Sequence, residues 1–210
     1  NIAARYDVFR KTVDPGDPDA TPPIAPTYES DESLRARTVL AMEALTVAGT
    51  EGAYEFHARS ADSRVSDVAI TSPSAGQVLV TVLSEEGDGV PSQDLLDAVD
   101  AVVQDEEVRP LCDSVEVAGA ELVTYQVAAT LHVQAGPDAE AVRQSALAAA
   151  KAYIADAHKL GAWVTLSGLF AALHQSGVTR VELDAPISDI EASAGQAPYC
   201  TDLTVSLADG

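Results

Sequence analysis

The sequence of 210 residues has few basic and few aromatic side chains. Only 12 residues are Lys or Arg against 33 Asp and Glu, which gives a net charge of -21. This charge disfavours nucleic acid and anionic lipid as partners, because binding to either requires cationic side chains that neutralise phosphates. Aromatic residues make up only 5% of the chain, so no large aromatic binding groove is indicated. We expect neither a nucleic acid nor a membrane as a partner.

Cysteines and long apolar runs are also scarce. Cys112 and Cys200 lie far apart and match no CxxC spacing, so we predict unpaired structural thiols rather than a zinc site or a disulfide framework. No apolar stretch approaches the roughly 20 residues that span a bilayer, and the N-terminus lacks a signal-peptide pattern. We expect a soluble protein made in the cytoplasm. Since the chain starts at Asn1 without an initiating Met, we also expect it to be part of a longer protein.

The usual catalytic motifs are missing as well. The sequence contains no GxSxG elbow, no Walker loop and no HExxH motif. His57, His132, His158 and His174 fall in four different predicted elements, and none lies four positions from another His or Cys, as a helical metal site requires. Structural or interface roles are favoured for His57 and His174, whereas His132 falls on the polar face of a predicted strand and His158 near a helix end, where a positive charge is favourable. We predict no catalytic, cofactor-binding or metal site.

Two acidic loops leave an alternative open. Asp14, Asp17 and Asp19, and separately the EEGDG run Glu85–Gly89, could offer the converging oxygens that calcium requires. Neither run matches an EF-hand loop, so the interpretation as solvated loops is favoured. A small acidic α+β enzyme or ligand-binding domain, which would use the EEGDG loop and a nearby His, is the competing hypothesis.

The hydrophobic content of 47% is ample for a packed core, and the first 28 residues differ from the rest. Arg5–Val13 has the composition of a strand, and five of the 11 prolines lie between Pro15 and Pro26, where they remove amide donors and favour extended backbone. We predict an extended arm and Pro-rich linker over residues 1–28. This arm should be poorly packed, or docked only through its first strand.

Residues 29–62 have the pattern of a helical pair. Ser30 and Thr50 are suited to cap the two helices, and Gly49 supplies the backbone freedom that ends the first. Hydrophobic spacing assigns one set of residues to the buried face of the first helix and charged residues to its other faces. The predicted buried set is Leu34, Thr38, Ala41 and Leu45, and the set placed elsewhere is Arg35, Arg37 and Glu43.

Residues 63–119 indicate a first α+β unit. Val65–Thr71 and Gln77–Ser84 resemble two strands joined by the turn sequence SPSAG. Ser92 can cap a helix, and Val115 begins a returning strand. The apolar face predicted for that helix consists of Leu95, Leu96, Val99, Val102 and Val103.

Residues 120–210 indicate a second, larger α+β unit. Apolar and polar residues alternate from Val123 to Val133, which is typical of a half-buried strand. Two helices and two further strands follow, and together the elements predict an α+β fold with mostly antiparallel strands. The first predicted helix opens at Asp138, ends at Gly161 and buries Val142, Ala146, Ala149, Tyr153, Ala157 and Leu160. The second is capped by Thr165, ends at Gly177 and buries Leu166, Leu169, Phe170 and Leu173. The two predicted strands are Val178–Leu183 and Thr201–Leu207.

Four segments carry a resemblance to a known family. Glu29–Ala61 contains ESD, LR, AG, GAYE and ARSA in that order. Three more segments follow in the same order: VLVTVLSEEGDGVPS at Val78–Ser92, VRPLCDSVEV at Val108–Val117 and TLSGLFAALHQSGVTRVEL at Thr165–Leu183. Together they resemble the baseplate J-like family of contractile phage tails, over about 29–207. The Pro-rich entry and the low Lys content depart from the family's usual pattern.

The resemblance implies a mechanical role rather than an enzymatic one. It implies a wedge component of a tail baseplate or related injection particle, with copies around a sixfold hub that rearrange when the sheath contracts. The implied partners are neighbouring copies and other baseplate and tail proteins, notably the lysozyme-like wedge protein and the product of the following tail gene. The implied location is the virion tail of a phage or prophage, assembled in the bacterial cytoplasm. The matching motif positions, to which the family assigns no catalytic role, are Gly52, Ala53, Tyr54, Glu55, Arg59, Gly87, Asp88, Gly89, Arg109 and Pro110.

Overall fold

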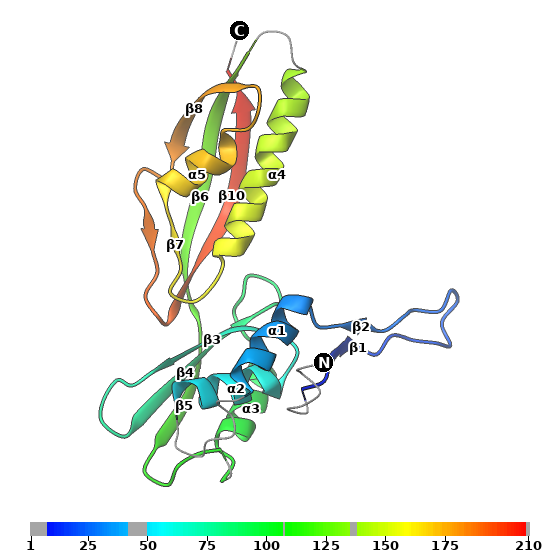
Figure 1. Ribbon diagram of the computed structural model, residues 1–210, viewed down its shortest axis with the longest axis vertical. Helices are drawn as coiled ribbons and strands as arrows, with labels where there is room; N and C mark the ends of the chain where they lie inside the picture. The colour runs from blue at the N-terminus through cyan, green and yellow to red at the C-terminus, as the bar shows by residue number, and fades with distance from the viewer. Residues whose placement is uncertain (1–7, 42–49, 107, 135–137, 209–210) are drawn as a thin grey trace. The chain divides into compact units, whose positions relative to one another are not determined.

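The chain divides into two compact α+β units, 1–120 and 121–210. The computed structural model describes residues 8–41, 50–106, 108–134 and 138–208 (Figure 1). Within these residues, five helices and several small sheets with mostly antiparallel pairing confirm the mixed α+β class that the sequence predicts. The finer division at residues 28 and 62 stays a prediction.

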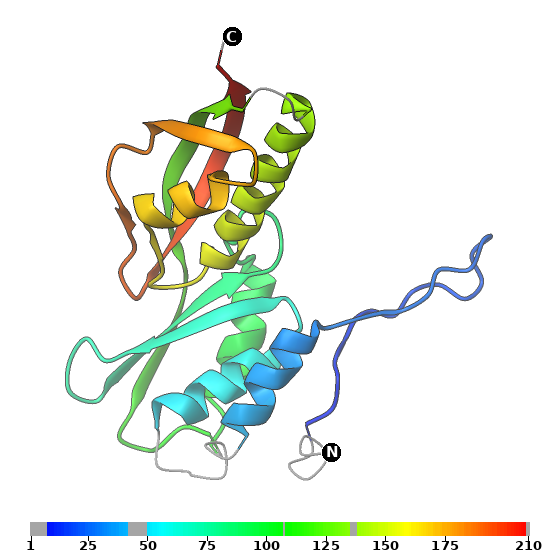
Figure 2. The ribbon, with the colours of Figure 1, turned by 45° about the horizontal axis from the view of Figure 1, so that its top comes forward.

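The Pro-rich segment folds back on itself as a hairpin. Strand β1, Thr12–Asp14, pairs antiparallel with β2, Thr27–Tyr28, and the two lie side by side in Figures 1 and 2. An isolated bridge between Asp17 and Ile24 continues the pairing toward the tip. The strand predicted over Arg5–Val13 was placed wrongly within the described part, because 8–11 are not a strand and β1 begins at Thr12; residues 1–7 lie outside the described residues.

The helical pair has the predicted caps. Helix α1 spans Asp31–Leu40, and Ser30 Oγ accepts a hydrogen bond of 3.1 Å from the Ser33 amide. Helix α2 spans Glu51–Ala61, and Thr50 Oγ1 accepts a hydrogen bond of 3.3 Å from the Ala53 amide. These oxygens satisfy amides that have no partner inside the helix. The predicted stop at Gly49 and the predicted buried positions beyond residue 41 lie outside the described residues.

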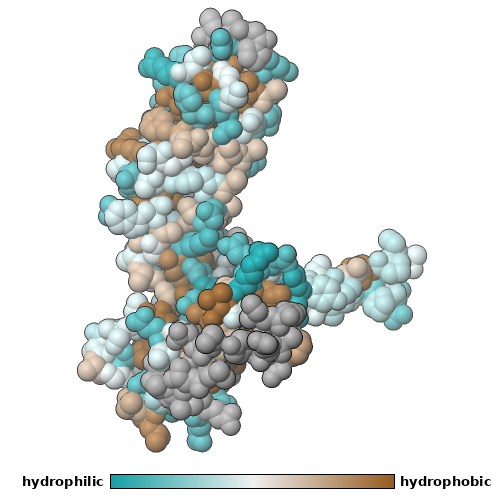
Figure 3. Space-filling view, viewed as in Figure 1, coloured by the Kyte–Doolittle hydropathy of each residue, from teal (hydrophilic) through white to brown (hydrophobic). Residues whose placement is uncertain are grey.

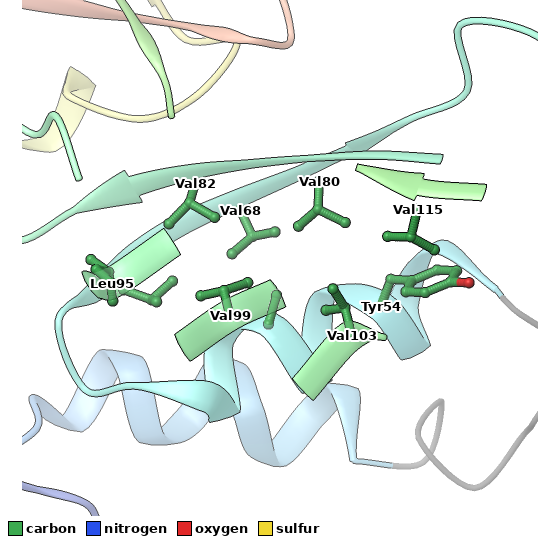
Figure 4. Close-up of a cluster of buried hydrophobic side chains, with 10 residues drawn as sticks. Tyr54, Val68, Val80, Val82, Leu95, Val99, Val103 and Val115 are labelled. Carbon is green, nitrogen blue, oxygen red and sulfur yellow. The ribbon is translucent and has the colours of Figure 1, made fainter. Parts of the chain in front are cut away.

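A three-stranded sheet in the order β3-β4-β5 forms the centre of the first unit. Strands β3 and β4 are antiparallel and have the predicted bounds, whereas β5 runs parallel to β4 because α3 connects them. Figure 4 shows valines from this sheet facing α2 and α3. The bounds are β3 Val65–Thr71, β4 Gln77–Ser84, α3 Gln93–Val103 and β5 Ser114–Gly119. The buried core comprises Tyr54, Ala58, Val65, Val68, Val80, Val82, Leu95, Val99, Val103 and Val115.

The second unit is a three-stranded sheet in the order β10-β6-β8 with helices packed on it. The long central strand β6 pairs parallel with β10 and antiparallel with β8, and its alternating pattern is reproduced by buried residues at every second position. Two short strands, β7 and β9, pair apart from this sheet. The bounds are β6 Glu121–Val133, α4 Ala139–Ala157, β7 Trp163–Val164, α5 Leu166–Leu173, β8 Val178–Ala185, β9 Ile190–Glu191 and β10 Gln196–Leu207.

The second unit differs from the prediction at its helix ends and faces. Helix α4 ends at Ala157 rather than at Gly161, and Ala150 rather than Ala149 is fully buried. Runs of alanine look alike at neighbouring positions, so hydropathy could not identify the buried one. Phe170, predicted to face inward, is exposed on α5, while Leu169 and Leu173 fill the core. An eight-residue helix buries a narrow stripe, and these two leucines occupy it.

Candidate functional site

Glu29 and Arg37 form a buried ion pair where the arm meets α1. The pair has two points of contact: Arg37 Nη2 lies 2.5 Å from Glu29 Oε1, and Arg37 Nε lies 3.2 Å from Oε2. The Arg37 and Glu29 side chains are only 5% and 3% exposed. We call this pair, together with the groups it holds on Phe9, Lys11 and Ser33, the root clasp.

The root clasp ties the chain before β1 to the start of α1. Arg37 Nη2 donates a hydrogen bond of 2.8 Å to the Phe9 carbonyl. The Lys11 amide donates one of 2.8 Å to Glu29 Oε1, and the Glu29 amide donates one of 3.0 Å to the Lys11 carbonyl. Ser33 Oγ donates to the remaining carboxylate oxygen at 2.9 Å. Both charged groups therefore have several partners, as buried charges require.

The charges in the root clasp depend on one another. Burial alone would raise the pKa of Glu29, but hydrogen bonds from Arg37, Lys11 and Ser33 outweigh it and hold that pKa below its usual range. Burial, followed by the like charge of Arg37, lowers the pKa of Lys11. Removing either member of the ion pair would leave an uncompensated charge in a buried site.

Sequence reasoning missed this cluster. It placed Arg37 off the buried face of α1, whereas the side chain is buried. Hydropathy patterns rank arginine as exposed, and the partner Glu29 lies before the helix, outside its periodic stripe. The one available signal was the ESD element of the family resemblance, which marks Glu29 without giving its partner.

Arg59, one of the motif positions, joins α2 to β3. Its guanidinium donates to Glu55 Oε1 at 2.8 Å and to the Ser66 carbonyl at 2.9 Å, and it also pairs with the Asp67 carboxylate. Contacts on both sides fix the direction of the guanidinium and leave it no evident catalytic task.

Tyr54, another motif position, joins α2 to the loop before β5. The ring is buried in the core, and its hydroxyl donates to Asp113 Oδ2 at 3.0 Å. Burial and then this hydrogen bond raise the pKa of Tyr54. Arg109 Nη1 donates to the Asp113 carbonyl at 3.1 Å, so the same loop is held from two sides. Of the neighbouring motif residues, Ala53 is buried, while Gly52 and Pro110 are half-buried.

The EEGDG loop at Glu85–Gly89 forms a tight turn between β4 and α3. Gly87 and Gly89 have φ of 64° and 98°, in the region that favours glycine. Asp88 Oδ1 accepts the Val90 amide at 3.1 Å, and Arg64 Nη1 lies 3.8 Å from Glu86 Oε2. The loop's polar atoms thus serve the turn and an ion pair, which does not favour the catalytic alternative.

The four histidines occupy four different elements, as the sequence predicted. His57 lies on α2, where burial lowers its pKa. On β6, His132 Nε2 lies 3.1 Å from Glu182 Oε1. His158 directly follows α4, and its Nδ1 lies 2.7 Å from the Pro198 carbonyl oxygen. His174 follows α5 and is exposed. These placements are typical of structural and surface histidines.

In the first acidic run, Asp14, Asp17 and Asp19, two of the carboxylates accept hydrogen bonds from nearby backbone amides. Asp14 Oδ1 accepts the Gly16 amide at 2.8 Å, and Asp17 Oδ1 accepts the Asp19 amide at 2.9 Å. Within the described ranges, no group of three or more His, Cys, Asp or Glu side chains is arranged to hold a metal ion.

The two cysteines are free. Free cysteines usually behave as small buried apolar residues, but neither of these is fully buried. Cys112 is exposed, and Cys200 is half-buried, with a pKa raised by that burial. Of the helices in the described part of the chain, none has both the length and the apolar character needed to cross a bilayer.

The enzyme alternative requires a pocket lined by a His and two carboxylates, and two hollows in the first unit lack this combination. A groove of about 480 Å³ is lined by residues 11–13 and 61–64, and it holds one carboxylate, that of Asp62. A smaller hollow of about 250 Å³ holds Glu51 and Asp113 beside the ring of Tyr54. Neither hollow is lined by a histidine.

The polar clusters therefore hold secondary-structure elements together, as in a scaffold, and comparison with known families agrees with that class. A model of the Baseplate J-like central domain matches residues 46–119, and a model of the Baseplate J-like protein C-terminal domain matches 125–206. The chain belongs to the baseplate J-like family, which confirms the resemblance seen in the sequence. One relative is Baseplate protein J of Escherichia phage P2, with 46% identity over 204 residues, or 97% of this chain and 68% of the relative.

Proposed function

We propose that this protein is a structural component of a phage tail baseplate. The observation that carries the proposal is the 46% identity to the P2 baseplate protein along 97% of the chain. The fold supports it, since the motif side chains of Tyr54 and Arg59 are engaged in contacts between elements. The protein resides in the tail of the virion and contacts other baseplate and tail proteins, including neighbouring copies.

In this role the protein acts mechanically and not as an enzyme. Two units that each have a packed hydrophobic core suit a part that carries load between neighbours in a ring. Rearrangement of that ring on host contact would transmit the signal for sheath contraction. The lysozyme-like wedge protein and the product of the following tail gene, which the family resemblance implies as partners, are the first candidates for direct contact.

The test is complementation in a strain that produces the particle. Deleting the gene should give tails without functional baseplates by electron microscopy, and wild-type protein supplied in trans should restore them. The non-enzymatic role is tested with His57→Gln and Glu86→Gln, which should restore infective or contractile particles as well as wild type does. Complete baseplates without this protein would contradict the proposal. If either variant assembles into particles of normal appearance that neither infect nor contract, the enzyme alternative is favoured.

A further inference from the structure

The hairpin of residues 12–28 exposes apolar side chains that it cannot bury itself. Val13, Ile24 and Tyr28 are 42% to 56% exposed, and Phe9 at its base is also exposed. Brown, apolar atoms are visible on the hairpin in Figure 3. Two strands of two and three residues provide no core, and an isolated two-stranded hairpin is marginal in water. Exposed apolar side chains that are concentrated in one short segment indicate an interaction site.

Local hydrogen bonds nevertheless define the shape of the hairpin. Asp17 and Ile24 exchange both backbone hydrogen bonds, at 3.0 and 2.8 Å, and Asp14 turns the chain by accepting the Gly16 amide. Gly16 has φ of 69°, and a Cβ there would lie 2.4 Å from the Ile24 carbonyl oxygen, so only glycine fits. Five prolines restrict the backbone further. A preorganised segment loses less entropy when it binds, which is an advantage for docking.

The root clasp fixes the base of this hairpin on both strands. It holds Lys11 just before β1 and Glu29 just after β2 through reciprocal hydrogen bonds. A base fixed on both strands and exposed apolar side chains along the hairpin are the features of a docking arm.

Charge indicates which partner the hairpin fits. Residues 12–28 contain three aspartates and no Lys or Arg, a net charge of -3, while the rest of the chain carries -18, the remainder of the total of -21. Like charge therefore disfavours docking of the hairpin onto a second copy. An apolar groove with Lys or Arg along its rim would complement both the apolar residues and the aspartates.

We propose that residues 12–28 form a docking arm for a basic-rimmed apolar groove on a different protein of the tail. This inference rests on the proposed function and adds to it the location of one contact and the chemistry of its partner.

The first experiment identifies the neighbour in assembled particles. A photoreactive benzoylphenylalanine replaces Ile24 in full-length protein, the particles are purified and irradiated, and cross-linked peptides are identified by mass spectrometry. We expect a cross-link to a different tail protein, at a site flanked by Lys or Arg. A cross-link to a second copy, or none from particles that contain the protein, would overturn the inference alone. Particles that lack the wild-type protein would overturn the proposed function and the inference with it.

The second experiment measures the contribution of the apolar side chains. The triple variant Val13→Ser, Ile24→Ser, Tyr28→Ser should lower incorporation into particles roughly tenfold or more, since apolar anchors dominate docking. The matched control is Val39→Ser, which removes another exposed apolar side chain from the same unit and should incorporate normally. Unchanged melting shows that the triple variant is folded. Equal incorporation of the two variants would refute the docking arm.

The third experiment uses the partner protein that cross-linking identifies, purified by itself, and tests whether the aspartates of the hairpin contribute to the affinity. The triple variant Asp14→Asn, Asp17→Asn, Asp19→Asn keeps the side-chain oxygens that accept hydrogen bonds in the turns and removes the three charges. We expect the affinity of wild type to fall as salt rises, and this dependence to flatten in the Asp→Asn triple variant. A salt dependence that is the same in both proteins would contradict a basic rim.

Discussion

Replacing Arg37 with Met should release the arm from α1. The substitution keeps an unbranched apolar side chain but leaves the Glu29 carboxylate buried beside an empty partner position. Breaking a buried ion pair by removing one partner costs about 3 kcal/mol or more. The Arg37 hydrogen bond to the Phe9 carbonyl, 2.8 Å long, is lost at the same time. Since undocking of the arm exposes Glu29 to water, we expect this cost to appear first as local opening rather than as global unfolding.

Amide hydrogen exchange measures that opening directly. The Lys11 and Glu29 amides both donate hydrogen bonds across the root clasp, so their exchange reports its opening. A loss of about 3 kcal/mol corresponds to roughly a hundredfold faster exchange or more. The matched control is Arg35→Met on the same helix. Arg35 is 77% exposed and lies 4.0 Å from Asp31, a geometry worth less than about 1 kcal/mol. If Arg37→Met accelerates the two amides no more than Arg35→Met does, the reasoning about the root clasp is wrong.

Acid should open the same contact. The pKa of Glu29 in the folded protein lies below its ordinary value of 4.5, so its stabilising contribution is complete above pH 4.5 and is lost as pH falls through the folded pKa. We therefore expect the Lys11 amide, corrected for its intrinsic rate, to lose protection below pH 4.5. Glu29→Gln should remove this pH dependence. A wild-type protein whose protection persists unchanged well below pH 4 would contradict the assignment.

Further predictions concern the cores and the association state. Tyr54→Phe should cost about 1 kcal/mol in denaturant unfolding because it removes the hydrogen bond to Asp113, whereas Tyr125→Phe should be neutral or stabilising because the buried Tyr125 hydroxyl has no hydrogen-bond partner in the described structure. Equal losses would contradict this. Gly168→Ala should cost about 1 to 3 kcal/mol in the same assay, since its Cβ would lie 2.2 Å from Tyr153 Oη; unchanged stability would show that the ring moves freely. Light scattering should show the isolated protein as a monomer or weak associate, since a charge of -21 opposes close packing of copies; a tight hexamer at low salt would refute this.

Much of the local structure followed from local chemistry. The caps at Ser30 and Thr50, the bounds of β3 and β4, and the alternating burial of β6 were predicted from residue type and spacing. Each depends on neighbours within a few positions. The Pro-rich segment was the weakest prediction, because prolines indicate extended backbone without indicating that the chain turns back.

The sequence by itself determined the α+β class, the order of the main elements and the family, because hydrophobic periodicity, capping residues and ordered motifs are local and additive signals. Only the tertiary structure decided that Arg37 is buried against Glu29, that β1 pairs with β2, and that β5 runs parallel to β4. These features join residues from different elements of the chain, and the desolvation of a charge or the direction of a strand depends on what surrounds it in space. For the same reason, exposure of Val13 and its neighbours, and with it the proposed docking arm, became visible only in the folded chain.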